Sequence, residues 1–415
     1  MSIWNELGFK ENPYDPRPLK PVEEDAKLFV GRSEESKQFA INVSSLKGGS
    51  IIVEGRIGVG KTSFVNIQQY RCWKSIKNFL PSFETVLIQD NTDSLTFMLS
   101  SLSNALHSLM KIHGEKEIKK NPVFNEVLNN ISKTLQASYG FQASVLGSGA
   151  GATKTIAPSQ PIAVVMPTIL HLAGKFIKEL QKFGYEGVII PINNLDIIDE
   201  SIVANFLSQI RDIALIREGF IWVLIGQEGL FSALESKAPR VSEVITGSPI
   251  LLKPLSLREV KQAIERRIAT LKLRESVDLP IHTDIIELLY EVSGGEISFI
   301  FKRSTDLLLQ FALQFPTEKG ISFQIGKQML RELARKKINS LNLTKRELDI
   351  LDRMANLETF RIRDCKIFGL KTPQALNRYV RKFSELGLLT KVQEKKLTNY
   401  RATGDVKILF TPNNS

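Results

Sequence analysis

The run GRIGVGKT at residues 55–62 is the feature that most constrains how this chain folds. It matches the spacing G-x-x-x-x-G-K-[ST], and it lies between the apolar run Ser50–Glu54 and a stretch compatible with a helix, Lys61–Tyr70. Glycines let successive backbone N–H groups curve around an anion, and the helix that follows adds the positive end of its dipole. The loop therefore predicts a buried strand before it and a helix after it.

We expect this loop to hold ATP through its phosphates, together with a magnesium ion. The Lys61 ammonium can reach the β and γ phosphates and serve both binding and catalysis, and the Thr62 hydroxyl can ligate Mg²⁺. Further contacts would come from backbone N–H groups and small side chains of the loop and the helix start. These residues are Gly55, Gly58, Val59, Gly60 and Ser63.

Apolar runs and helical stretches alternate on both sides of this loop. Strands are expected at 84–89, 187–192 and 220–225, and helices at 99–110, 123–135, 169–183 and 201–217. Strands that alternate with helices pair in parallel and are covered on both faces. The fold class is therefore α/β, with the parallel sheet of a P-loop NTPase. The glycine-rich stretch at about 139–161 is expected as an inserted hairpin or loop.

The pattern changes twice after the sheet. From Pro254 to about Lys337 it is wholly helical, with helices expected at 256–273, 284–292, 297–315 and 322–337. The tail then offers three short helices and two strands, 388–392 and 397–402, in the order of a winged helix. We therefore expect three parts, which are an extended proline-rich arm with the P-loop core at 1–253, a helical lid at 254–337 and a winged-helix domain at 338–415.

Almost all of the net charge lies in the tail. The chain carries 55 Lys and Arg against 44 Asp and Glu, a formal charge of +11, and residues 331–415 hold 19 basic and 9 acidic side chains, or +10 of it. A compact basic segment is the electrostatic footprint of a nucleic-acid partner. We expect double-stranded DNA to be that partner, while a winged helix that docks proteins is the alternative.

The third helical stretch of the tail, 373–386, combines an apolar face with a polar one. Polar and basic side chains at helical spacing can enter a major groove and contact base edges and phosphates. The expected DNA-binding residues of this helix are Gln374, Asn377, Arg378, Arg381 and Lys382. The turn between the strands adds Lys395 and Lys396 at flanking phosphates, with Arg401 behind them.

The strand 187–192 ends in Asn193 and Asn194, where a P-loop ATPase is expected to carry two acids. Amide oxygens can contact the magnesium shell, and we expect this of Asn193, but they carry no negative charge and cannot accept a proton. Asp196 is the nearest substitute, with Asp199 and Glu200 beyond it; capping of the next helix is the alternative role of these acids. Because amides replace the expected acids at this strand end, we expect ATP hydrolysis to be slow.

Two more residues are candidates for catalysis. Gln227, which follows the strand 220–225, could contact the γ phosphate or the attacking water, or it could be part of a plain turn. Arg240 could act as an arginine finger on the nucleotide of a neighbouring subunit, or it could form a local salt bridge.

Several classes of protein are not expected. No apolar stretch approaches the 18 or more residues of a membrane helix. The N-terminus lacks the basic start and apolar block of a secretory signal, and Cys72 and Cys365 are too few for a disulfide framework, so we expect a cytoplasmic protein. The histidines do not stand at ligand spacing, so no structural metal is expected.

Taken together, these residues resemble the AAA+ ATPases of the origin-recognition and archaeal initiator type, with their bacterial relatives on mobile and defence elements. The likeness rests on the order and spacing of Asn12–Tyr14, Phe29–Arg32, the phosphate loop, the strand end 193–196, Pro239–Arg240, Pro254–Ser256, Ser293–Gly295 and the terminal winged helix. In that family the region of Val30, Gly31 and Arg32 lies against adenine, so the resemblance implies ATP rather than GTP. It also implies a sensing arginine near Ser298, whereas Arg303 follows a turn and a half later.

The combined interpretation is an ATP-binding switch whose nucleotide state controls engagement of DNA, with self-assembly through nucleotide interfaces. Two other functions fit the same residues. One is a signalling NTPase of antiviral defence that acts on a partner effector protein, and the other is an ATP-responsive transcription regulator. Whether the chain turns over ATP as an enzyme stays open at this stage, because Asn193 and Asn194 replace the expected acids.

Overall fold

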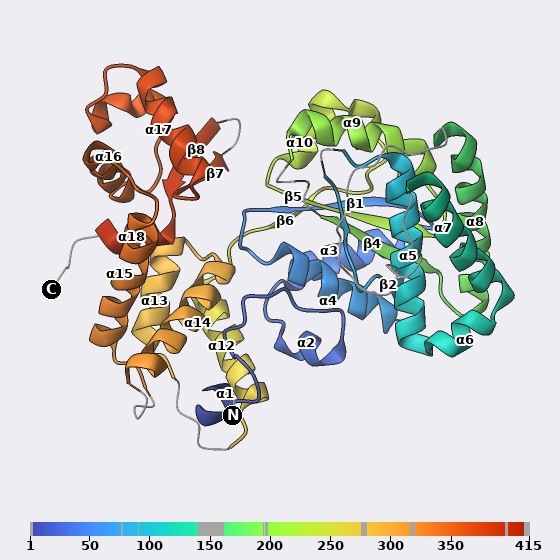
Figure 1. Cartoon of the computed structure of the whole chain (residues 1–415), viewed down its shortest axis with the longest axis horizontal. Helices are drawn as coiled ribbons and strands as arrows, with labels where there is room; N and C mark the ends of the chain where they lie inside the picture. The colour runs from blue at the N-terminus through green and yellow to red at the C-terminus, as the bar shows by residue number, and fades with distance from the viewer. Residues whose placement is uncertain are drawn as a thin grey trace. The chain divides into compact units, whose positions relative to one another are not determined.

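The computed structural model describes residues 3–75, 78–89, 91–139, 162–193, 195, 198–274, 280–315, 320–394 and 397–410. The chain forms two compact units, shown with their elements in Figure 1. Unit 1 comprises residues 1–17, 56–60 and 253–415, and unit 2 comprises residues 18–55 and 61–252. The glycine-rich stretch 140–161 lies outside the described residues, so the inserted hairpin stays a prediction.

A parallel sheet forms the centre of unit 2. Its described strands are β1 (Gly49–Gly55), β2 (Phe79–Pro81), β3 (Val86–Leu87), β4 (Gly187–Asn193), β5 (Phe220–Gly226) and β6 (Ile250–Leu252). The order is β2-β4-β5-β1-β6, and β3 also pairs with β4. Ile51 stands opposite Val223, which sets the register of the central pair. The α/β parallel-sheet prediction is confirmed; β2 and β6 were not predicted, because three residues are too few to show a period.

Helices cover the sheet of unit 2. They are α2 (Glu23–Leu28), α3 (Ser33–Ser44), α4 (Lys61–Trp73), α5 (Ser94–His113), α6 (Glu115–Lys120), α7 (Pro122–Tyr139), α8 (Ile162–Lys182), α9 (Glu200–Ile210), α10 (Leu230–Lys237) and α11 (Pro239–Ser242). A continuous apolar core joins the helices from α5 to α11 to the strands. Within it the Phe97 ring lies 5.1 Å from that of Trp222 and 5.5 Å from that of Phe206.

The helix expected at 201–217 changes its winding near its end. After α9 the segment Arg211–Leu215 forms a π-helical turn. The indole Nε1 of Trp222, a buried residue of β5, donates to the carbonyl of Ala214 at 2.7 Å. A buried indole N–H needs an acceptor, and the carbonyl of Ala214, within the wider π-helical turn, supplies it.

Unit 1 contains the lid and the tail. Its elements are α1 (Ile3–Glu6), the lid helices α12 (Leu257–Leu271), α13 (Thr283–Ser293), α14 (Ile297–Gln314) and α15 (Phe323–Asn339), and the tail elements α16 (Lys345–Ala355), η3 (Ile362–Phe368), α17 (Pro373–Glu385), β7 (Leu389–Glu394), β8 (Leu397–Ala402) and α18 (Gly404–Phe410). Capping boxes at Ser256 and Thr344 begin α12 and α16, and Thr372 caps α17. Strands β7 and β8 form an antiparallel hairpin.

Helix α18, the last helix of the tail, forms hydrogen bonds with the lid helices α14 and α15. Asp405 of α18 is only 2 % exposed, and its Oδ2 accepts hydrogen bonds from Arg303 of α14 at 2.5 Å and from Lys337 of α15 at 2.7 Å. A Cβ on Gly404 would lie 2.4 Å from the Phe299 ring, so only glycine allows this approach. The tail thus shares a compact unit with the lid.

The proline-rich arm differs from the extended segment that we expected. It contains the short helices α1 and α2, and its first part packs on the lid within unit 1. The backbone N–H of Lys10 donates to the carbonyl of Leu271 at 2.8 Å, and Asn12 Nδ2 donates to Thr305 Oγ1 at 2.9 Å. Tyr14 is fully buried. The arm is ordered by contacts with lid residues far away in the sequence, which the pattern of neighbouring residues does not reveal.

Among the described residues, no helix combines the length and the apolar character that crossing a membrane would require.

Candidate nucleotide site and nucleic-acid interface

The phosphate loop has the backbone geometry that its sequence predicts. Strand β1 ends at Gly55 and helix α4 begins at Lys61, so residues 56–60 form the turn between them; we call these five residues the loop crest. Gly58 and Gly60 have φ values of 80° and 92°, a region that L side chains rarely adopt. Lys61 is buried, and its Nζ donates to the carbonyl of Gly55 at 2.9 Å.

Asn193 and Thr62 are brought together in unit 2. Asn193 ends β4, and its Nδ2 lies 3.4 Å from the Oγ1 of Thr62 in the first turn of α4. A threonine hydroxyl beside an amide fits Mg²⁺, which takes a few protein oxygens and otherwise keeps waters and phosphate oxygens. Asn194 and Asp196 lie outside the described residues, so their roles stay predictions.

The two acids beyond this strand end have structural partners. Asp199 caps helix α9, and its side chain accepts from the backbone N–H of Ser201 at 2.8 Å. Glu200 forms an ion pair with Lys237 at 2.9 Å. The capping alternative therefore holds for Asp199.

A buried carboxylate that the sequence reasoning missed stands in β1. Glu54 is 6 % exposed, and it accepts from the backbone N–H groups of Gly229 and Phe231 at the start of α10. Burial raises the pKa of Glu54. Through these bonds Glu54 fixes the turn after β5 that contains the partly exposed Gln227. The sequence feature that could have revealed Glu54 is the presence of an acidic residue within an otherwise apolar strand.

The segment expected near adenine lies beside α4. The Phe29 ring is 6.3 Å from that of Phe64 in α4, and Val30, Gly31 and Arg32 follow Phe29 in the chain. Arg32 adopts a left-handed φ of 65°, is buried, and pairs with Glu35 at 3.2 Å. A non-glycine residue in this region is strained and needs support from its surroundings.

Ser63 and Arg240 have positions that the sequence did not show. The Ser63 hydroxyl, expected near nucleotide, accepts from the backbone N–H of Leu19 at 3.1 Å and so holds the arm. Arg240 is exposed on the short helix α11, and its carbonyl accepts from the Nε of Arg211 at 2.8 Å. A role for Arg240 in a neighbouring subunit's site stays a prediction.

In unit 1 the start of helix α14 lies against the loop crest. The backbone N–H of Ser298 donates to the carbonyl of Gly58 at 3.1 Å. A carboxylate oxygen of Glu296 lies 3.7 Å from the place where a Cβ on Gly58 would stand. Sequence reasoning missed Glu296. Arg303, considered as a sensing arginine, instead pairs with Asp306 and Asp405 and belongs to the lid and tail network.

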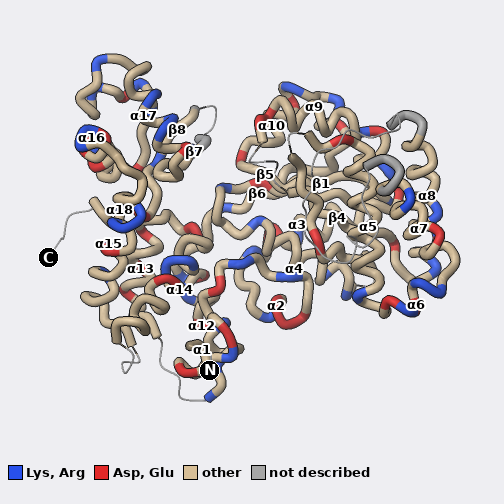
Figure 2. The backbone as a smooth tube through the Cα atoms, in the orientation of Figure 1, with Lys and Arg blue, Asp and Glu red and all other residues tan. Residues whose placement is uncertain are grey.

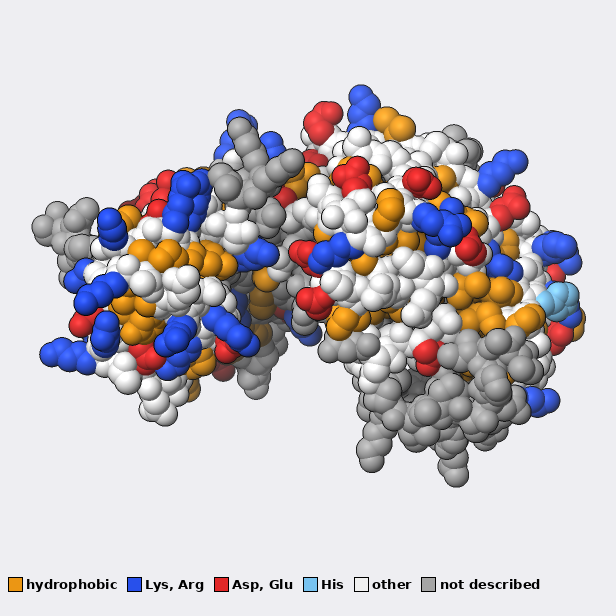
Figure 3. Space-filling view, turned by 90° about the horizontal axis from the view of Figure 1, so that it is seen from above, with side chains coloured by type: hydrophobic (Ala, Val, Ile, Leu, Met, Phe, Trp, Pro, Cys, Tyr) orange, Lys and Arg blue, Asp and Glu red, His pale blue; other side chains and the backbone are white. Residues whose placement is uncertain are grey.

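Helix α17 divides its faces as its sequence predicts. Leu376, Val380 and Phe383 are buried in the tail core, whereas the expected DNA-binding side chains of the helix are exposed; they are Gln374, Asn377, Arg378, Arg381 and Lys382. Figure 2 shows basic positions on α16 and α17, and Figure 3, a view from above, shows Lys and Arg side chains among apolar ones on the surface of this part of the chain.

Some of these charges are already partnered. Lys382 pairs with Glu347 of α16 at 2.5 Å, and Arg381 pairs with Glu385 at 2.9 Å. Lys395 and Lys396 lie outside the described residues. Arg401 does not extend toward solvent as a phosphate contact would, because its guanidinium donates to the carbonyls of Ser293 and Glu291 at 3.2 and 3.3 Å.

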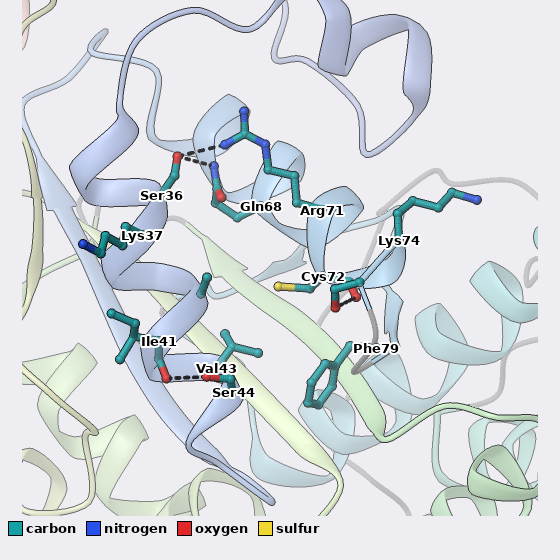
Figure 4. A pocket seen from close by; sticks show the side chains of 12 residues that line it. Ser36, Lys37, Ile41, Val43, Ser44, Gln68, Arg71, Cys72, Lys74 and Phe79 are labelled. Atoms are coloured by element: carbon teal, nitrogen blue, oxygen red, sulfur yellow. Dashed lines mark hydrogen bonds between the residues drawn. The ribbon is translucent and has the colours of Figure 1, made fainter.

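A cavity of about 790 Å³ opens between α3 and α4 in unit 2 (Figure 4). Its lining is mostly apolar, and the Ser36 hydroxyl accepts from Gln68 and Arg71, both at 3.0 Å. Burial raises the pKa of the Cys72 thiol beside it to about 12. None of the predicted site residues lines this cavity.

Comparison with known proteins places the fold. No protein-family model matches the chain, and no curated protein matches it. The ORC2 protein of Aeropyrum pernix, in its ADPNP-ADP complexes, is 14% identical, with 97% of this chain and 96% of that chain covered and a TM-score of 0.51. The ADP form of that protein is 14% identical, with 96% of this chain and 95% of that chain covered and a TM-score of 0.46. The Aeropyrum pernix ORC1 protein in complex with DNA is 12% identical, with 97% and 96% covered and a TM-score of 0.46. The first likeness shows that this chain shares the overall fold of that ORC2 protein, which agrees with the resemblance that its motifs implied.

Proposed function

We propose that the chain is an ATP-binding switch that engages double-stranded DNA through its tail and hydrolyses ATP slowly. The observation that carries the proposal is the phosphate loop between β1 and α4, with left-handed glycines at 58 and 60 and Lys61 at the start of the helix. Backbone N–H groups in such a turn gather phosphate oxygens, and a buried ammonium adds charge. The likeness to ORC2, whose structure was determined with ADPNP and ADP, supports a nucleotide as the ligand.

Magnesium would be held by Thr62, with Asn193 beside it. The ion would neutralise phosphate charge when the nucleotide is bound. Asn193 can orient a ligand of the ion but cannot take the proton of an attacking water, so a carboxylate base is absent from this position. Slow turnover and a long-lived bound state follow, and Gln227 is proposed to contact the γ phosphate from the turn that Glu54 fixes. Arg240 is proposed to serve a neighbouring subunit's nucleotide after self-assembly.

The tail supplies the DNA-binding part of the proposal. Its three helical segments and its antiparallel hairpin have the element order of a winged helix, with α17 as the helix for the major groove. The exposed face of α17 carries amide and basic side chains, of which Arg378, Asn377 and Gln374 are proposed to reach base edges. We place the protein in the cytoplasm.

Lys61→Ala tests the nucleotide part. The variant should lose most of the increase in melting temperature that ATP with Mg²⁺ gives the natural protein, because the ammonium contributes chiefly when phosphates are present. Lys178→Ala, which removes an exposed charge of the same unit on α8, is the matched control and should keep the full increase. An equal increase in all three proteins would show that the loop does not bind the nucleotide.

A further inference from the structure

Glu296 places a carboxylate at the loop crest, where a nucleotide site gathers anions. It is the residue before α14 and is partly buried. Its Oε2 lies 3.7 Å from the Cβ position of Gly58, and the N–H of Ser298, two residues later, donates to the carbonyl of Gly58. The hydrogen bond keeps this turn of the lid against the crest. A negative charge here opposes the binding of phosphates.

Two arginines act on this carboxylate from different parts of unit 1. Arg56 belongs to the loop crest itself, and Arg401 comes from strand β8 of the C-terminal hairpin; the positive charges of both act on Glu296. Arg401 is held by the carbonyls of Ser293 and Glu291. A Cβ on Gly294 would overlap its Nη1 at 1.6 Å, so the glycine allows the guanidinium to approach. Glu358 and Lys407 are the other charged groups that act on this region.

We propose that Glu296 lowers the affinity of the loop for nucleotide phosphates and that Arg401 offsets this effect, so that the C-terminal hairpin sets nucleotide affinity. The inference rests on the proposed nucleotide site. Like charges within a few ångströms in a partly buried site repel one another, even after screening by solvent and salt. A neighbouring guanidinium removes part of that repulsion, and this one is attached to the segment proposed to meet DNA.

The charge state of Glu296 is set by two opposing causes. Burial raises the pKa of Glu296 to about 7, and the charges of Arg401 and Arg56 act in the lowering direction. The group is therefore largely ionised at pH 8 and largely neutral at pH 6. Bound phosphates favour the neutral form still more, so nucleotide binding at neutral pH takes up a proton.

Binding of a fluorescent ADP derivative to the full chain tests the inference with the isosteric variant Glu296→Gln. At pH 8 its dissociation constant should fall about three- to tenfold below that of the natural protein, since the repelling charge is gone, and at pH 6 the two should nearly coincide. Glu291→Gln removes an exposed carboxylate from the preceding helix and should bind like the natural protein.

A double-mutant cycle tests the part played by the hairpin. Arg401→Gln should raise the dissociation constant about threefold at pH 8 in the natural background and leave it unchanged in the Glu296→Gln background, because the arginine acts through that carboxylate. Equal affinities of the natural protein and Glu296→Gln at pH 8 would overturn the inference, and this comparison holds even if Arg401→Gln does not fold. If the natural protein binds no nucleotide, the proposed function fails as well, which is a different result.

Discussion

Asn193 is the residue on which we expect the rate of ATP hydrolysis to depend. Its amide stands beside the Thr62 hydroxyl, where a competent hydrolase would hold a carboxylate, so the natural protein should turn over ATP more slowly than about one per second, the low end of common enzyme rates. The paired change Asn193→Asp with Asn194→Glu should raise turnover, since a positioned base typically contributes on the order of 100-fold or more. Steady-state phosphate release with and without DNA measures both.

The interpretation of this strand end has a clear test. Rapid turnover in the natural protein, or no gain in the paired variant, would show that another carboxylate acts as the base. Asp199→Asn is the control, because Asp199 caps α9 and should affect stability rather than turnover.

Glu296 also makes stability depend on pH in the absence of nucleotide. Burial raises its folded pKa from 4.5 to about 7, so the folded state binds a proton more tightly than the unfolded chain does. The free energy of unfolding should therefore fall as pH rises from about 5 to above 7 and then level off. Glu296→Gln should remove this fall and be the more stable protein at pH 8. Urea unfolding at pH 5, 6, 7 and 8 measures the slope, and an identical slope in both proteins would contradict the assignment.

Helix α17 is the element through which DNA binding is expected. Arg378 is exposed on it, whereas Lys382 shares its charge with Glu347. Arg378→Ala should therefore weaken duplex DNA binding and reduce the salt slope by about 0.9, the value for one lost phosphate contact, or relax base preference if the contact is to a base edge. Fluorescence anisotropy at several salt concentrations gives both quantities.

Arg335→Ala is the matched control for that helix. It removes the same charge from an exposed position on α15, so the long-range field of unit 1 falls equally in both variants. If the two variants lose affinity to the same extent, the helix makes no specific contact and only net charge matters. Binding of a partner protein that responds to ATP, without binding of DNA, would instead favour the signalling alternative.

At the level of the whole chain, a buried carboxylate of the tail joins two basic side chains of the lid. Asp405 is buried, and although burial raises its pKa, the hydrogen bonds and charges of Arg303 and Lys337 together hold the pKa below its usual value. Deletion of the tail after Lys337 would therefore uncover lid surface as well as remove the basic segment. Point substitutions are the cleaner test of DNA binding.

Asp405→Asn should destabilise the protein by about 3 kcal/mol, because it leaves two cations without their buried partner. A depressed folded pKa means that this stabilisation is present above the unfolded value and is lost as pH falls below about 4. The exposed Asp349→Asn on α16 is the control and should change stability little. Thermal unfolding at pH 7 and pH 3 measures the difference, which should shrink at the lower pH; a difference that is equal at both values would contradict the linkage.

Local patterns in the sequence were enough for the α/β core, the phosphate loop and the two faces of α17. Each of these depends on residues close together in the chain, whose spacing alone reveals a period or a glycine-rich turn. The same reasoning located Asn193 as a departure from the expected acids, because a strand end can be read from the apolar run before it.

Tertiary structure decided where distant segments meet. The arm packs on the lid, Arg401 turns to the carbonyls at the end of α13, Arg303 pairs with Asp405 a hundred residues away, and Glu54 and Glu296 stand beside turns from other elements. The spacing of residues in the sequence does not predict these contacts. Each one joins polar groups that are distant in the chain and come together only in the folded protein, where buried polar groups need hydrogen-bond partners. The sequence by itself determined the helices, the strands and the phosphate loop. The packing of distant segments determined which charged side chains lie near that loop.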